Sequence, residues 1–164
     1  DLLGSANLLS LVAARAVACH HPTGVKGDEM IMDRVSLGVF GGMLWDTIPE
    51  LRPAIKEMIN ARLDTAIVLE EEPDIEFGDF VAFVIGPQIL TPIEEGREDP
   101  VLVVRLAELV RRAVAYDGPG RERFHDLVDL FFLENLDFEA AQTKIRTVAP
   151  DIEPLVRNFR LSRQ

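Results

Sequence analysis

The chain has 164 residues, 48% of them apolar, and its 17 basic and 28 acidic side chains give a net charge of -11. A chain of this length can bury one sizeable core, and so large an apolar fraction argues against an acidic disordered protein. The negative charge repels phosphates and anionic lipid headgroups, which argues against nucleic-acid and membrane binding and favours a basic partner or none.

The first predicted element is an apolar helix from about Leu2 to Cys19. A secretory signal peptide would begin with basic residues and keep charge out of its apolar stretch. Here the sequence begins with Asp1, and Arg15 interrupts the run, so we reject that interpretation. Cys19 is the single cysteine and cannot form an internal disulfide, so we expect a cytoplasmic location.

Cys19, His20 and His21 are all metal-ligand types at the end of this first helix. Zinc ligands are usually separated by two or more residues, whereas direct neighbours seldom reach the same ion. Histidines that follow a helix also complement the negative end of its dipole. We therefore predict a helix end rather than a metal site, and no cofactor for the protein as a whole.

A second helix is predicted from Asp28 toward Trp45, and Gly38, Gly41 and Gly42 lie in its far half. These glycines either break the helix or let another helix approach closely. A third helix is predicted from Pro49. The run from Ala66 to Leu69 fits either a strand or the end of that helix, and we favour the helix.

The remaining chain also shows helical periodicity between breaks at proline and glycine. The predicted elements are helices over 73–90, 100–116, 121–136, 137–148 and 150–159, with a cut at Gly86 and Pro87, a polar loop over 91–99 and a turn over 117–120. We expect one all-α domain over residues 1–164. Its fold is either an irregular helical bundle or a short α-solenoid-like stack of about seven to eight helices.

Three segments that begin at Pro49, Pro73 and Pro150 share a proline followed by an acidic residue. True repeats would produce stacked helical pairs. The chemistry of a helix start explains the same pattern locally, because proline suits the first turn and an acid there meets the positive end of the dipole. Both explanations remain open at the level of sequence.

The charge distribution supplies the main functional hypothesis. No lysine or arginine occurs between Arg62 and Arg97, while nine acids lie there: Asp64, Glu70, Glu71, Glu72, Asp74, Glu76, Asp79, Glu94 and Glu95. They form either a solvated face or a docking surface that attracts a basic partner. Basic residues gather elsewhere, at Arg105, Arg111, Arg112, Arg121 and Arg123.

Two other classes of function stay open. Glu122 and His125 have the spacing that puts two ligands on one helical face, so with Asp126 and Asp129 they are the candidates for a metal-dependent hydrolase. A surface ion pair is the simpler interpretation of that cluster. The apolar excess at Phe77, Phe80, Phe83, Phe131 and Phe132 would instead suit a structural protein that forms homo-oligomers.

The segment from Arg121 to Leu136, RERFHDLVDLFFLENL, resembles the late helix of small all-helical bacterial immunity proteins from polymorphic toxin systems. The similarity covers about a tenth of the chain and consists mostly of apolar pattern. It implies an inhibitor without catalytic activity that binds one toxin directly. It assigns no functional residue, and the acidic character agrees with a basic toxin as the target.

Overall fold

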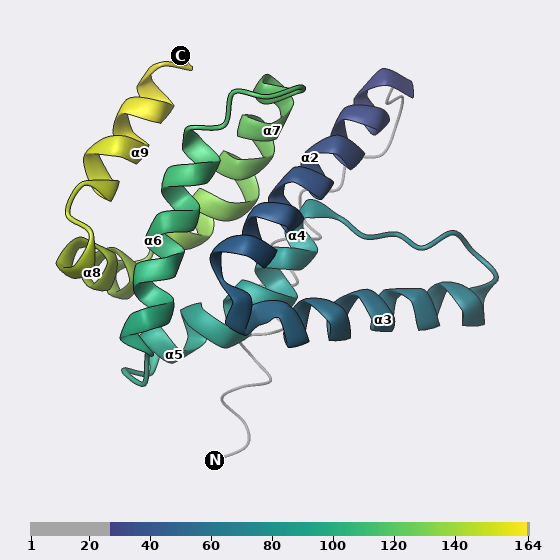
Figure 1. Cartoon of the computed structure of the whole chain (residues 1–164), viewed down its shortest axis with the longest axis horizontal. Coiled ribbons are helices and arrows are strands. Elements are labelled where there is room, and N and C mark those ends of the chain that lie inside the picture. The colour runs from purple at the N-terminus through teal and green to yellow at the C-terminus, as the bar shows by residue number, and fades with distance from the viewer. Residues whose placement is uncertain (1–26, 164) are drawn as a thin grey trace.

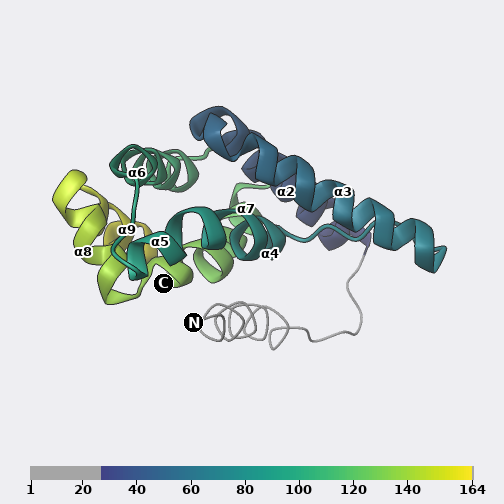
Figure 2. The same ribbon diagram turned by 90° about the horizontal axis from the view of Figure 1, so that it is seen from below.

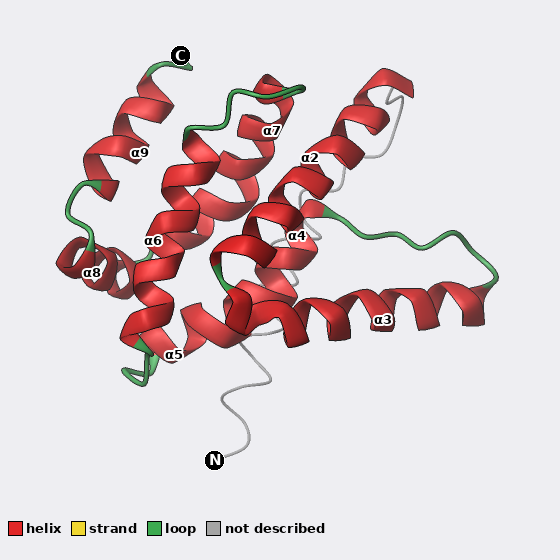
Figure 3. Ribbon diagram, viewed as in Figure 1, coloured by secondary structure: helices red, strands yellow, loops and turns green. Residues whose placement is uncertain are grey.

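The computed structural model describes residues 27–163, and their side chains from residue 31 onward. The predicted first helix, with Cys19, His20 and His21, lies outside this range. Residues 27–163 form helices and connecting loops without a strand (Figure 3), so the all-α prediction is confirmed. The segment from Ala66 to Leu69 ends a helix, which excludes the strand alternative.

Helix α2, Gly27–Thr47, begins within one residue of the predicted start and continues through all three glycines. A Cβ atom built on Gly41 would lie 2.9 Å from Cζ of Phe80, whereas one on Gly38 or Gly42 would meet nothing within 4 Å. The close approach of another helix is therefore confirmed at Gly41 alone. The other alternative, a break in the helix at these glycines, does not occur.

These glycines give a matched pair of substitutions. Gly38→Ala should raise the free energy of unfolding by about 0.5–1 kcal/mol, because alanine favours the helix and the site is open. Gly41→Ala should lower it by about 1 kcal/mol or more, because the methyl group must displace the buried Phe80 ring. Chemical denaturation measures both. Equal effects of the two substitutions would show that Gly41 has no packing role.

A short 3-10 turn, η1 (Pro49–Leu51), leads into α3 (Arg52–Leu69), so the predicted third helix is present and begins at Pro49 as a 3-10 turn. The next helix starts later than predicted. Residues 73–76 are not helical, and α4 spans Phe77–Asp79. Pro73 thus lies in a connecting segment rather than at a helix start, which removes the third copy of the suggested repeat.

The predicted cut at Gly86 and Pro87 is wrong. The chain continues as a π-helical segment, η2 (Phe80–Leu90), and then as α5 (Thr91–Glu94), within the predicted loop. The N–H of Thr91 donates to the carbonyl of Gly86, five residues earlier. Proline clashes with the carbonyl four residues before it in an α-helix, and the wider π turn relieves this conflict.

The second half of the chain matches its predicted helices closely. They are α6 (Pro100–Val114), the continuous run α7 (Arg121–Leu127), η3 (Val128–Leu133) and η4 (Glu134–Leu136), then α8 (Glu139–Val148) and α9 (Ile152–Leu161). Asp99 caps α6, because its carboxylate accepts from the N–H of Val101 at 2.8 Å.

Figures 1 and 2 show the arrangement as an irregular bundle: α6 packs against α2 on one side and against α8 and α9 on the other. Arg111 on α6 donates to both oxygens of Asp151, at 2.8 and 2.7 Å, just before α9 begins. These hydrogen bonds lower the pKa of Asp151 and tie the two helices together.

The core is rich in phenylalanine where α2, α4 and η3 meet. The ring of Phe40 is fully buried, with its centroid 4.4 Å from that of Phe77 and 5.3 Å from that of Phe132. Phe80 lies at 6.2 Å from the same ring. Tilted and edge-on contacts at such distances add to the free energy gained by burial. This cluster joins α2 to α4, η2 and η3 at the centre of the core.

Candidate interaction surface

Helix α3 is only partly built into the bundle. Its first half buries Ile55 and Met58, but its free end extends beyond the other helices (Figure 1). There Ile67, Val68 and Leu69 are 75%, 79% and 57% exposed. Single exposed apolar side chains are ordinary, whereas a contiguous group of them marks an interaction site.

The end of α3 is fixed by its backbone. Glu70 has φ 57°, in the left-handed region, and its N–H and that of Glu71 bond back to the carbonyls of Ile67 and Ala66. This arrangement closes the helix as a C-terminal cap usually does, although glycine is the common residue there. The chain then returns through residues 70–76 to α4 (Figure 1), so it exposes a run of acids directly after the apolar group.

We call these residues the acidic tip: Ile67, Val68, Leu69, Glu70, Glu71, Glu72 and Asp74. All seven are exposed. Arg34 on α2 lies 3.9 Å from Glu72, and both side chains are largely in solvent, so this pair contributes little. The tip therefore combines an apolar group with several carboxylates that remain hydrated.

Two further acids of the predicted set, Asp64 and Glu76, lie beside the acidic tip but do not belong to it. Asp64 is exposed on α3, one turn before Val68, and can extend the tip. Glu76 is also exposed and lies just before α4, where its backbone N–H donates to Asp79 at 3.0 Å. Glu76 and Asp79 form a reciprocal capping box.

Asp79 does not belong to the exposed surface. Its side chain is 7% exposed and pairs with Arg62 of α3. It also caps α4 through the hydrogen bond from Glu76, so both of its functions are structural. Burial without compensation is costly for a carboxylate, which explains why the partner is an arginine. Sequence alone shows the charge of Asp79 but not its burial.

Glu94 and Glu95 are exposed at the end of α5, and α5 lies far from the free end of α3 in both views (Figures 1 and 2). Glu95 also pairs with Arg97. The structure therefore divides the predicted acidic segment. Residues 70–74 gather at the tip, whereas Glu94 and Glu95 belong to another part of the surface.

The predicted basic cluster is largely neutralised within the molecule. Four of its arginines pair with carboxylates: Arg105 with Glu50, Arg111 with Asp151, Arg121 with Asp117 and Arg123 with Asp33. The fifth, Arg112, donates to the hydroxyl of Thr47 at 2.6 Å. These positive charges therefore support the bundle instead of forming a basic face opposite the tip.

The alternative hydrolase cluster is only partly assembled. Glu122, His125 and Asp126 line one surface hollow of about 830 Å³ between α7 and α9, whereas Asp129 does not. Asp126 pairs with Arg163, and Asp129 accepts from Arg160 at 2.7 Å. Within residues 27–163, no group of three or more histidine, cysteine or acidic side chains is arranged to hold a metal ion.

His125 is held by packing. Its ring meets that of Phe159 edge-on, with centroids 4.9 Å apart, and its Nε2 is buried without a hydrogen-bond partner among the described residues. Burial, and then the nearby charges of Arg163 and Arg121, lower the pKa of His125 below its ordinary value. The neutral ring therefore predominates at neutral pH, and it acts as part of the contact between α7 and α9.

The aromatic residues considered for self-association are mostly internal. Phe77, Phe80 and Phe132 are buried and Phe131 is half-buried. Only Phe83 of this set is exposed, at 45%, and the guanidinium of Arg62 covers it at 5.3 Å. The two most exposed large apolar side chains of residues 31–163 lie elsewhere, at Ile67 and Val68 on α3, and Leu69 beside them is 57% exposed.

No protein-family model, curated protein or solved structure matches this chain. None of the described helices is both long enough and apolar enough to cross a bilayer.

Proposed function

We propose that this chain is a protein-interaction domain without catalytic activity, and that the acidic tip binds a basic partner. The observation that carries the proposal is the exposure of Ile67, Val68 and Leu69 at the end of a projecting helix, directly followed by hydrated acids. Apolar side chains surrounded by polar ones are the usual composition of a binding surface.

The charges favour a basic partner over a second copy of the chain. Two copies meeting tip to tip would bring Glu70, Glu71 and Glu72 of each close together, and like charges in contact oppose association. A basic surface would instead be attracted over roughly 8–10 Å at ordinary salt. The apolar group would then supply the short-range contact.

A finer form of the proposal follows from the resemblance at Arg121 to Leu136. Under that proposal the chain is an immunity-type inhibitor, and its partner is a basic toxin produced by a bacterium. The resembling segment itself lies in the core, because Phe124, Val128 and Phe132 are fully buried. This segment would therefore support the helical bundle, and the acidic tip would supply the contact with the toxin.

The test uses two triple charge reversals of equal size. Replacing Glu70, Glu71 and Glu72 with lysine should slow association with the captured partner about tenfold or more, and change dissociation much less, because exposed charges act mainly on encounter. The matched control reverses Glu94, Glu134 and Glu139, which are exposed on α5, η4 and α8. Stopped-flow or surface-based kinetics at low and physiological salt measure both.

A second pair of variants tests the apolar group. Ile67→Ser with Val68→Ser should speed dissociation, while the free energy of unfolding changes by about 0.5 kcal/mol or less for each residue. A partner that binds the reversed tip and the control equally fast, with no dependence on salt, would disprove the proposed docking surface.

A further inference from the structure

We propose that a second site, the hollow between α8 and α9, binds a small amphiphile with an apolar chain and one anionic head, such as a medium-length carboxylate. The hollow has a volume of about 340 Å³. This lies at the small end of the range of roughly 300–1,000 Å³ that is typical of ligand pockets. The site is separate from the acidic tip and does not depend on its function.

The floor of the hollow is apolar and comes from three parts of the chain. The apolar residues that line it include Leu133 of η3, Leu136 of η4, Ile145 of α8 and Val156 of α9. Leu133, Leu136 and Ile145 are buried in the bundle. Such a surface favours a hydrocarbon chain, because each methylene that leaves water stabilises binding by about 0.8 kcal/mol at most.

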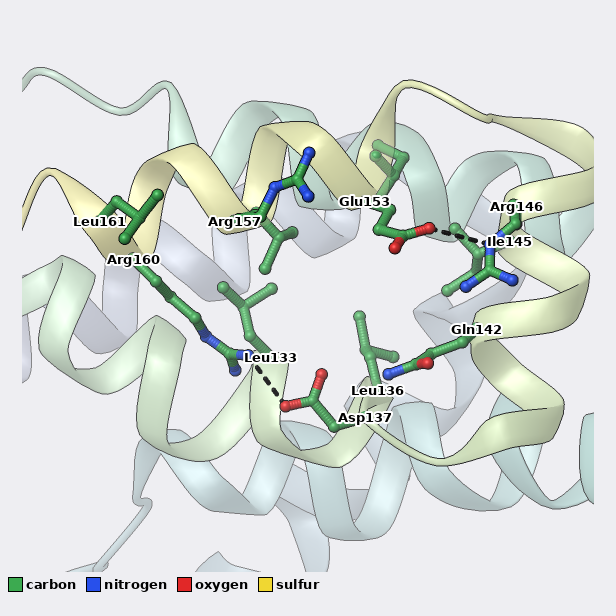
Figure 4. Close-up of a pocket in the computed structure, with 12 residues that line it drawn as sticks. Leu133, Leu136, Asp137, Gln142, Ile145, Arg146, Glu153, Arg157, Arg160 and Leu161 are labelled. Carbon is green, nitrogen blue, oxygen red and sulfur yellow. Dashed lines mark hydrogen bonds and ion pairs between the residues drawn. The ribbon is translucent and has the colours of Figure 1, made fainter.

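Two ion pairs lie at the edges of the opening of the hollow. Arg160 donates to Asp137 at 2.9 Å on one side, and Arg146 donates to Glu153 at 2.9 Å on the other, with Leu136 between them (Figure 4). Glu153 and Arg160 are seven residues apart on α9, which corresponds to about 10 Å along the helix axis. An extended peptide would fit only about three residues there. The length suits a small molecule better.

The charge of the head group follows from Arg157. Each of the other arginines at the opening is paired with a carboxylate. Arg157 lies on α9 between Glu153 and Arg160 (Figure 4), and it has no ion-pair partner among residues 31–163. A carboxylate bound over the apolar floor would give this guanidinium a charge-assisted hydrogen bond. In a chain of net charge -11, this local cation decides which head group is accepted.

Sodium octanoate, with 1-octanol as its neutral counterpart, tests the proposal on the full chain. Titration followed by ¹H–¹⁵N NMR should show saturable shifts from octanoate confined to residues around 133–161. Arg157→Ala should weaken octanoate binding about threefold to tenfold and leave the binding of 1-octanol unchanged. Arg34→Ala removes the same charge from exposed α2 and should change neither affinity.

A third variant, Val156→Trp, fills the hollow and should abolish the shifts from both probes. Circular dichroism checks that this variant still folds. Octanoate shifts that are absent, or that are scattered over the surface, would overturn the proposal. Equal octanoate affinities for the wild type and Arg157→Ala would also overturn it, because the anionic head would then have no partner.

Discussion

Phe40→Ala should lower the free energy of unfolding by about 3–5 kcal/mol, the range found when a large buried aromatic residue is truncated. The side chain is fully buried and contacts the rings of Phe77, Phe80 and Phe132, so its loss leaves a cavity that these rings cannot fill. Urea denaturation, with the slope compared between variants, measures the change.

Phe83→Ala is the matched control for this substitution. It removes the same atoms from a side chain that is 45% exposed, so we expect a loss of about 1 kcal/mol or less. Similar losses for the two variants would mean that the phenylalanine cluster does not form the centre of the core.

Arg62→Ala should cost about 2–4 kcal/mol, because it leaves the buried carboxylate of Asp79 without its counter-charge. The Arg62 side chain is itself 38% exposed, which places the expected loss below that of a fully buried pair. Thermal and urea unfolding should agree. The fold around α4 would be most affected, because Asp79 also caps that helix.

Two controls separate this ion pair from other effects of losing an arginine. Arg97→Ala breaks an exposed pair with Glu95 and should cost less than about 1 kcal/mol. The double variant Arg62→Ala with Asp79→Ala should recover part of the loss, since no unpaired carboxylate remains buried. Additive losses in the double variant would show that the two side chains do not stabilise each other.

The helical part of the fold follows from the sequence because apolar spacing and helix-start signals agree. In α6, Pro100 and Asp99 mark the start, and Leu106, Leu109 and Val110 define the buried face. The π-helical turns near Pro87 could not be predicted in this way. A proline normally ends a helix, and the local sequence does not show that tertiary packing keeps the chain helical through it.

The candidate surface was predictable only in part. The charge of Glu70, Glu71 and Glu72 is visible in the sequence, but the exposure of Ile67 and Val68 is not. The apolar positions of a helix do not show how far along it the packing against other helices extends. The hollow beside Arg157 depends on how three consecutive segments between residues 133 and 161 pack in space, which helical periodicity does not show. The run AIVLEEE at residues 66–72 did indicate the acidic tip, because an apolar helix end is followed there directly by three acids.

Under the proposed function, the projection of α3 separates the residues that bind the partner from the residues that form the core. The side chains of Ile67, Val68, Glu71 and Glu72 contribute little to the core, so substitutions there change the free energy of unfolding only slightly. If the tip binds the partner as proposed, substitutions there would change the partner and leave the helical bundle unchanged.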